Sequence, residues 1–416
     1  MAEEASSEPQ WLTEKWLEPK LRVYFKNESL KLEKLEIRPA VAKGENYASV
    51  MNRVEVEFST KDSLEKSTIT FLAKSTFSDK DPASDLLSDY GIYTREMDMY
   101  EQILPYLADL VHEELGDSRK LFAGTVSVDR EKNCIIFEDL SLEHYKVASR
   151  LEKLDLEHTH LLLERLATFH AAAAVLAERR PGIFERNYDR GFFNKHTRGY
   201  EPIMQNLLQA LSRSLELNPD LKQRYQDKIN RLINNVMDYG EKSTSGDPHD
   251  FITLCHGDLW TTNVMFQYDE QGHPNNVILI DFQFSVWNSP AIDLHYLFST
   301  SIQENLRWKR QPELVQFYYY KLKDSLKKLN YTGQIPSLFD FQQQFQNRAF
   351  YAVFSSLIFE PCMLYTGKEK ASIEQGLSGS ESGLRFRNSV YEAQHIQDKL
   401  PLVLPFLDQL GLLDEM

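Results

Sequence analysis

The chain of 416 residues has only three cysteines, Cys134, Cys255 and Cys362, each in an apolar stretch. Three cysteines form no paired framework, so the sequence excludes a disulfide-stabilised secreted fold and fits a reducing compartment. Basic residues are also few. The 47 lysines and arginines stand against 62 aspartates and glutamates, for a formal net charge of -15. A chain with that balance has no basic face to offset phosphates, which argues against a nucleic-acid or anionic-membrane partner.

Long apolar runs are missing as well. No stretch approaches the length of a membrane span, and residues 1–8 are acidic and polar. The sequence therefore predicts a cytoplasmic protein that is neither secreted nor inserted in a membrane. The only low-complexity patch, residues 376–383, predicts a loop between C-terminal helices, with a lid over a substrate as the alternative.

The most informative stretch is residues 256–263, which follow the pattern H-x-D-x-x-x-x-N, with Asp281 and Phe282 further along the chain. Phosphoryl transfer from ATP requires a carboxylate that orients the attacking hydroxyl, and oxygen ligands that hold Mg²⁺ against the phosphates. Asp258 is the candidate base. Asn263 belongs to the same catalytic set and, with Asp281, is a candidate Mg²⁺ ligand. The alternative, chance turn residues in an unrelated α/β domain, requires all four residue types to recur in order.

Between these two motifs the composition predicts a β-hairpin, with strands over residues 264–268 and 277–280. Antiparallel pairing would place Asn263 at the entrance of the hairpin and Asp281 at its exit. Both side chains would then lie at the same end of the ribbon, within reach of one metal ion.

Upstream, a β-rich run over residues 67–74 ends in Lys74, which we expect to neutralise the ATP phosphates. A helical pattern follows over residues 92–104 and is expected to end at Pro105. Glu96, early in that helix, is the candidate partner of Lys74 in an ion pair.

Two further segments complete a nucleotide site. Strands over residues 35–41 and 50–58 flank a loop whose candidate phosphate contacts are Gly44, Asn46 and Ser49. That loop has one glycine instead of the three of a G-x-G-x-x-G motif, and an ordinary hairpin turn is the alternative.

A buried strand over residues 134–137 leads into Glu138 and Leu140, whose main-chain atoms are candidate adenine contacts. An ordinary strand end is the alternative here too. His170, on a helix predicted over residues 161–176, is interpreted as a satisfied buried histidine, because no second ligand stands at helical spacing.

After Asp281 the pattern departs from protein kinases. Gln283 replaces the glycine of D-F-G, A-P-E is absent, and a helix follows almost at once. These differences argue against a peptide substrate. Asp293 is assigned a structural role in the first turn of that helix. Some of the large aromatic residues of the C-terminal part are expected to line an apolar acceptor pocket, namely Trp260, Trp287, Phe350, Tyr351 and Phe354.

Taken together, these segments resemble the insect ecdysteroid 22-kinase-like (CHK kinase-like) proteins, within the aminoglycoside and choline phosphotransferase branch of the kinase fold. The resemblance spans nearly the whole chain. It rests on residues 44–49, 137–140, 169–171, 256–260, 280–283 and 290–294, together with Glu96, Tyr100, Leu104, Pro105 and Asn263.

The resemblance implies an α+β, two-lobed protein kinase-like fold. A small β-rich N-lobe would cover residues 1–139, and a large mainly helical C-lobe residues 140–416. It also implies ATP and Mg²⁺ as cofactors, and phosphorylation of a hydroxyl on a small molecule, an ecdysteroid in the founding case. The acceptor and the oligomeric state are left open.

Two other functions stay open. A choline- or aminoglycoside-type kinase would share the ATP chemistry but needs an acidic or aromatic cage for a cationic acceptor. A nucleotide-binding pseudokinase is disfavoured because Lys74, Glu96, Asp258, Asn263 and Asp281 are all present.

Overall fold

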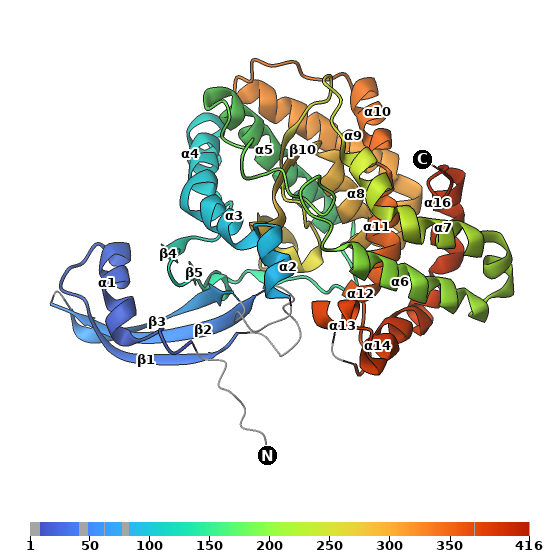
Figure 1. Cartoon of the computed structure of the whole chain (residues 1–416). Coiled ribbons are helices and arrows are strands. Elements are labelled where there is room, and N and C mark those ends of the chain that lie inside the picture. The colour runs from blue at the N-terminus through green and yellow to red at the C-terminus, as the bar shows by residue number, and fades with distance from the viewer. Residues whose placement is uncertain (1–8, 41–48, 62, 77–82, 370, 416) are drawn as a thin grey trace.

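The computed structural model describes residues 9–40, 49–61, 63–76, 83–369 and 371–415. It has the predicted α+β fold of a protein kinase, with a small lobe built on a β-sheet and a large, mainly helical lobe beside it (Figure 1). The functional cleft lies between the two lobes. The boundary at residues 139 and 140 stays a prediction, which we retain because the last strand pairing of the small-lobe sheet ends at Glu138.

The small lobe contains a five-stranded sheet with the order β1-β2-β3-β5-β4, in which every pairing is antiparallel. Buried and more exposed residues alternate along β2, so one face of the sheet packs against helix α1. Leu17 and Leu21 of the helix pack there with Val54 and Val56. The strands are β1 (Lys31–Pro39), β2 (Val50–Thr60), β3 (Ser63–Ser75), β4 (Thr125–Asp129) and β5 (Cys134–Glu138), and α1 spans Glu14–Phe25.

The helical segment that follows does not end at Pro105, contrary to the sequence-based expectation. After α2 (Ser84–Asp89), α3 (Ile92–Asp98) runs into a π-helical turn, η1 (Met99–Ile103), and then into α4 (Leu104–Leu115). The N–H of Leu104 bonds the carbonyl of Met99, five residues back. This π-turn places Pro105 in the first turn of α4, where a residue without an N–H is tolerated.

The core of the large lobe is built around α5 (Leu156–Arg179), which packs along α9 (Glu304–Lys328). By length and composition α5 could cross a membrane, which the sequence reading overlooked, but 72% of its most apolar window is buried inside the protein. It is the one such helix in the described part of the chain. Its apolarity is accounted for by its central place in the core.

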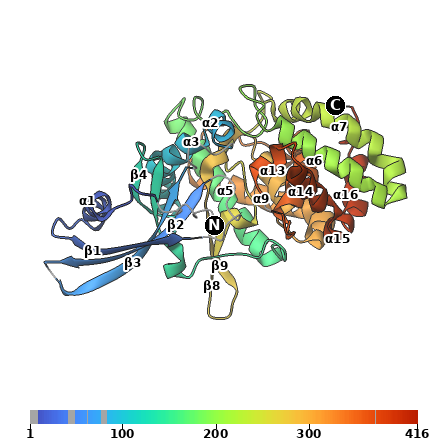
Figure 2. The same ribbon diagram turned by 60° about the horizontal axis from the view of Figure 1, so that its bottom comes forward.

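Short strands of the large lobe carry the catalytic segments. The hairpin of β8 (Val264–Tyr268) and β9 (Pro274–Leu279) confirms the predicted hairpin and projects from the lobe, as Figure 2 shows. The other strands are β6 (Lys146–Val147), β7 (Thr253–Cys255) and β10 (Val286–Asn288). Single 3₁₀ turns are η2 (Leu140–Glu143), η3 (Leu215–Leu217), η4 (Thr261–Asn263) and η5 (Phe282–Phe284).

The remaining helices of the large lobe are α6 (Glu201–Ser214), α7 (Pro219–Thr244), α8 (Ala291–Thr300), α10 (Leu338–Asn347), α11 (Phe350–Phe354), π-helix η6 (Ser355–Phe359), α12 (Glu360–Met363), α13 (Ile373–Leu377), α14 (Glu381–Glu392), α15 (Gln394–Gln397) and α16 (Leu400–Gln409). Of these, α6, α7 and α16 lie on the side away from the small-lobe sheet (Figure 2).

The patch at residues 376–383 is not a simple loop. Gly376 lies inside α13 and Gly383 in the first turn of α14, where Ser380 caps the helix. A Cβ on Gly383 would lie 2.6 Å from the carbonyl oxygen of Ser378. The glycine there allows a close helix–helix turn, and the patch does not line the cleft.

Candidate active site

The candidate catalytic loop, residues 256–263, follows β7 and turns sharply at Gly257. This glycine has φ of 81°, in the left-handed region, and a Cβ built on it would lie 2.0 Å from the carbonyl oxygen of Phe284. Only a residue without a side chain fits such a close approach of two backbones. The turn places Asp258 against Asn263, which lines the cleft, while Asp258 itself lies directly behind the described residues that form the cleft wall.

The Asp258 carboxylate is held at both oxygens. Tyr296 donates its hydroxyl to Oδ1 at 2.6 Å, and Asn263 donates from Nδ2 to Oδ2 at 3.1 Å. Asn263 Nδ2 also donates to the main-chain oxygen of Asp258 at 2.8 Å. Burial raises the pKa of the Asp258 carboxyl to about 7, although both hydrogen bonds oppose the rise.

Asp293 in the first turn of α8 holds the backbone of the loop. Its carboxylate accepts the N–H of His256 at 2.7 Å and that of Gly257 at 2.8 Å. His170 donates to the same carboxylate at 3.0 Å and accepts a hydrogen bond from the hydroxyl of Tyr318 at 2.6 Å. The structural roles predicted for Asp293 and His170 are both confirmed.

His170, Cys255 and Asp293 lie close enough together to raise the question of a metal site. Both ring nitrogens of His170 are already bonded, and Cys255 Sγ donates to the carbonyl of Ser289 at 3.2 Å. Burial raises the pKa of the Cys255 thiol well above its ordinary value. The thiol therefore stays protonated, and the cluster is a hydrogen-bonded support for the catalytic loop.

Asn263 and Asp281 lie at the same end of the β8–β9 hairpin, as its register requires. Val264 pairs with Leu279, and the N–H of Ile280 donates to the carbonyl of Asn263 at 3.0 Å. Asp281 then adopts a left-handed conformation with φ of 65°, which few residues other than glycine, asparagine and aspartate accept.

Lys74 joins the two lobes. Its ammonium group lies 2.7 Å from Glu96 Oε1 and 2.8 Å from Asp281 Oδ1. Burial by itself would lower the pKa of Lys74, but Asp281 and Glu96 outweigh it and hold that pKa above its ordinary value. Burial raises the pKa of Glu96 to about 7, with Lys74 acting in the opposite direction. The predicted ion pair of Lys74 with Glu96 is present in the structure.

Arg95 is a residue that the sequence reading missed. It is 2% exposed, and its guanidinium donates to the carbonyls of Gln283 at 2.9 Å, Asn187 at 3.0 Å and Tyr90 at 2.8 Å. These bonds tie α3 to the segment just after Asp281 and keep Glu96 facing Lys74. Its position directly before Glu96 is the only sequence signal that could have pointed to it.

The hinge is the connection from β5 into the large lobe, residues 138–140. Its residues Glu138 and Leu140 both line the cleft. The Glu138 carboxylate accepts the N–H of Gly124 at 2.5 Å and pairs with Lys120 at 2.8 Å. Asp139 is 4% exposed and accepts hydrogen bonds from Arg53, Thr70 and Ser141. These bonds anchor the hinge to the sheet.

The phosphate loop is described only in part. Gly44 and Asn46 lie outside the described residues. Ser49 is buried at the start of β2 and is not among the described residues that line the cleft. Their roles stay predictions.

The cleft is a cavity of about 940 Å³ that receives side chains from both lobes. Lys74, Glu96, Asn263 and Asp281 line one part of it. Another wall comes from Val147, Arg150, Trp260, Met363 and Tyr365. Arg150 donates to the carbonyls of Met363 and Tyr365, which fixes this C-terminal segment over the cleft.

The aromatic residues expected in an acceptor pocket are mostly core residues. Trp260 lines the cleft, but Phe350, Tyr351 and Phe354 are at most 1% exposed and belong to the large-lobe core. Trp287 stacks on Phe184 with ring centroids 5.0 Å apart. Their periodic spacing buries them inside the helical layer.

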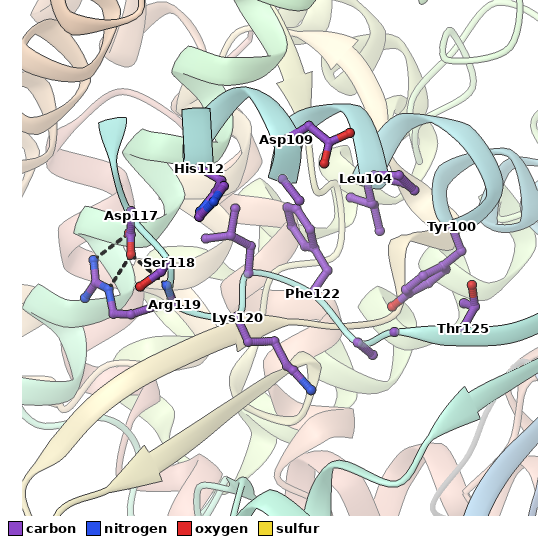
Figure 3. Close-up of a pocket in the computed structure, with 15 residues that line it drawn as sticks. Tyr100, Leu104, Asp109, His112, Asp117, Ser118, Arg119, Lys120, Phe122 and Thr125 are labelled. Carbon is purple, nitrogen blue, oxygen red and sulfur yellow. Dashed lines mark hydrogen bonds and ion pairs between the residues drawn. The ribbon is translucent and has the colours of Figure 1, made fainter. Parts of the chain in front are cut away.

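A second pocket, of about 360 Å³, lies behind the hinge between α4 and residues 117–125 (Figure 3). Figure 3 shows the ion pair of Asp117 with Arg119 at one end of the pocket, near His112 of α4, and Tyr100 at the other end. Tyr100 lines both this pocket and the cleft. None of the predicted site residues that the structure describes lines it.

The small sheet-based lobe and the larger helical lobe are those of the protein kinase-like fold. Within that fold, the model of the ecdysteroid kinase-like family matches residues 43–331, which include every candidate site residue. The chain therefore belongs to the ecdysteroid kinase-like family.

Two other comparisons do not identify the acceptor. No curated protein sequence matches the chain. Among solved structures it is similar to the choline kinase LicA from Streptococcus pneumoniae, with 15% identity over 82% of this chain and 98% of that chain, at a TM-score of 0.35. A similarity at that level supports no conclusion about the acceptor.

Proposed function

We propose that the protein is an ATP- and Mg²⁺-dependent kinase that phosphorylates a hydroxyl of an ecdysteroid or a similar apolar metabolite or xenobiotic. One observation carries the proposal. Lys74, Glu96 and Asp281 form a charged cluster at the cleft, and Asp258 is bonded to Asn263 within the loop that precedes the β8–β9 hairpin. Four separate segments therefore supply what phosphoryl transfer requires. A pseudokinase would not need the complete set.

The side chains present fit a magnesium ion. Asn263 directs its amide nitrogen to Asp258, so its carbonyl oxygen is turned away from that residue. Asp281 pairs with Lys74 through Oδ1, which leaves Oδ2 as the oxygen that could bind the ion. Carboxylate and amide oxygens are the ligands Mg²⁺ prefers, and the ion would neutralise charge on the phosphates.

The proposed reaction divides the work among few residues. The acceptor oxygen forms a bond to the γ-phosphorus of ATP as the bond from that phosphorus to the β,γ-bridging oxygen breaks and ADP leaves. Asp258 accepts the proton of the acceptor hydroxyl. Lys74, with a third ammonium hydrogen beyond those directed at Glu96 and Asp281, binds the phosphates.

The remaining nucleotide contacts are proposals of the same kind. Main-chain atoms of Glu138 and Leu140 would meet the adenine edge, and Gly44, Asn46 and Ser49 would lie over the phosphates. Both hinge residues line the cleft, and the bonds of Asp139 keep the hinge in place.

An apolar acceptor is favoured by the wall that Val147, Trp260 and Met363 form. A choline- or aminoglycoside-type kinase would need an open cage for a cation. Glu369, the acidic residue of the C-terminal segment on this wall, is already paired with Arg385 at 3.1 Å. We therefore place a cationic acceptor second.

We also propose a cytoplasmic location without a nucleic-acid or membrane partner, because the chain carries a net charge of -15. All three cysteines are free, which fits a reducing compartment.

The test is ³²P transfer from Mg-ATP to a panel of ecdysteroids, other sterols, plant phenolics and choline. Asp258→Asn should lower transfer to a small but measurable residual rate while ATP binding persists. Glu270→Gln is the matched control, since it removes a carboxylate from the exposed turn of the hairpin that follows the Asp258 loop. Transfer to choline alone would reverse the ranking of acceptors, and unchanged transfer by Asp258→Asn would contradict the site.

A further inference from the structure

Helix α8 holds three consecutive residues of the catalytic loop. Asp293 accepts the N–H groups of His256 and Gly257. Three residues later on the same helix, Tyr296 donates to the side chain of Asp258 at 2.6 Å. Residues three apart lie on one helix face. A single face of α8 therefore fixes the backbone and the carboxylate of the loop together.

The bond from Tyr296 completes the restraint on that carboxylate. Asn263 holds Oδ2 and Tyr296 holds Oδ1. The group cannot rotate about its Cβ–Cγ bond without breaking one of these bonds. An ionised carboxylate oxygen accepts more than one hydrogen bond, so each oxygen keeps a position for a further donor.

We propose that Tyr296 is a positioning residue for phosphoryl transfer, whose hydroxyl aims the Asp258 carboxylate at the acceptor hydroxyl; this inference rests on the proposed kinase function. Two properties of the Tyr296 side chain suit it to this positioning role. The side chain is 1% exposed, and burial together with Asp258 holds the pKa of its hydroxyl well above the ordinary value. The hydroxyl thus remains a hydrogen-bond donor.

The hydroxyl of Tyr296 can be removed while the packing of its ring is kept. The Tyr296 ring packs among aromatic rings, with centroids 6.3 Å from those of Phe192, Tyr351 and Phe359. Tyr296→Phe keeps that ring and removes only the hydroxyl. Tyr319→Phe is the matched control, because it removes a buried hydroxyl that donates to the carbonyl of Pro336 at 2.9 Å, outside the cleft.

The experiment is a double-mutant cycle with Tyr296→Phe, Asp258→Asn and both together, using the acceptor identified in the transfer panel. Loss of a hydrogen bond to a charged group predicts that Tyr296→Phe lowers kcat by about 10- to 100-fold. The KM for ATP and the Tm should match those of Tyr319→Phe. In the Asp258→Asn background the same change should have no further effect, since Tyr296 acts through Asp258.

Full kcat in Tyr296→Phe, or the same loss in both backgrounds, would overturn the inference and leave the proposed function standing. Absence of transfer by the wild-type protein would contradict the proposed function instead. Crystal structures with Mg²⁺ and a non-hydrolysable ATP analogue then decide the positioning role. A turned or multiply placed Asp258 carboxylate in Tyr296→Phe supports it, and an unchanged carboxylate overturns it.

Discussion

The ammonium group of Lys74 lies 2.8 Å from Asp281 Oδ1, although the two residues stand 207 positions apart in the chain. Lys74 lies near the end of β3 in the small lobe, and Asp281 directly follows the β8–β9 hairpin of the large lobe. Their contact joins the lobes across the cleft. Burial strengthens such a pair because little water screens it.

Asp281→Asn should weaken Mg²⁺-dependent ATP binding by at least about 10-fold, because the substitution removes a charged ligand and the partner of Lys74. Isothermal titration with Mg²⁺ and again with EDTA measures the difference. Glu270→Gln, on the exposed turn of the same hairpin, should bind as the wild type does. Equal Mg²⁺ dependence in Asp281→Asn would exclude Asp281 as a ligand.

Arg95→Lys should lower both stability and activity. A lysine keeps the charge but cannot reach three carbonyls, and buried carbonyls without a donor cost about 2 kcal/mol or more. Thermal unfolding and the KM for ATP measure the two effects. Arg130→Lys is the control, because its pairs with Asp98 and Glu101 are largely exposed and contribute little. Similar Tm values for both variants would refute the role of Arg95.

Gly257→Ala should destabilise the catalytic loop by about 3 kcal/mol, through a left-handed backbone and a clash with the carbonyl of Phe284. Denaturant unfolding measures this change. Gly379→Ala should be neutral, since nothing lies within 4 Å of a Cβ built there. Two variants of equal stability would show that the loop relaxes around the added methyl group.

The pKa of Asp258, raised from 3.8 to about 7 chiefly by burial, predicts opposite trends for activity and stability. The folded protein holds this proton more tightly than the unfolded chain does. The free energy of unfolding therefore falls as pH rises from about 4 to about 7, and then levels off. The deprotonated form accepts the acceptor's proton, so kcat/KM should rise over the approach to pH 7.

Asp258→Asn should remove the share of both trends that comes from Asp258, while Glu96, whose pKa burial also raises to about 7, keeps its share of the stability trend. Between about pH 5 and about pH 8 the Tm of the variant should rise relative to that of the wild type, because the variant lacks the buried carboxylate of Asp258. Differential scanning calorimetry at the two pH values measures this gap. A gap that stays constant would show that Asp258 is already ionised at the lower pH.

Local patterns were enough to predict much of this site. The hairpin between Asn263 and Asp281 follows from alternating apolar residues and a polar turn, and its antiparallel register brings the two residues to one end without help from the rest of the fold. The strand ending at Lys74 and the helix carrying Glu96 follow from composition in the same way. The local periodicity of apolar residues indicates such elements.

The structural role of Asp293 was predicted from the sequence, but only the tertiary structure revealed the roles of Tyr296 and Arg95. Both act through partners on other segments, and no periodicity indicates which carbonyl or carboxylate a buried polar group will meet. The fold also decided that Phe350 and Phe354 pack in the core while Met363 and Tyr365 line the cleft. Burial of an apolar side chain contributes a similar free energy whether that side chain packs in the core or beside the cleft. The chain sequence therefore determined the chemistry of the reacting groups, and long-range packing determined how they are held.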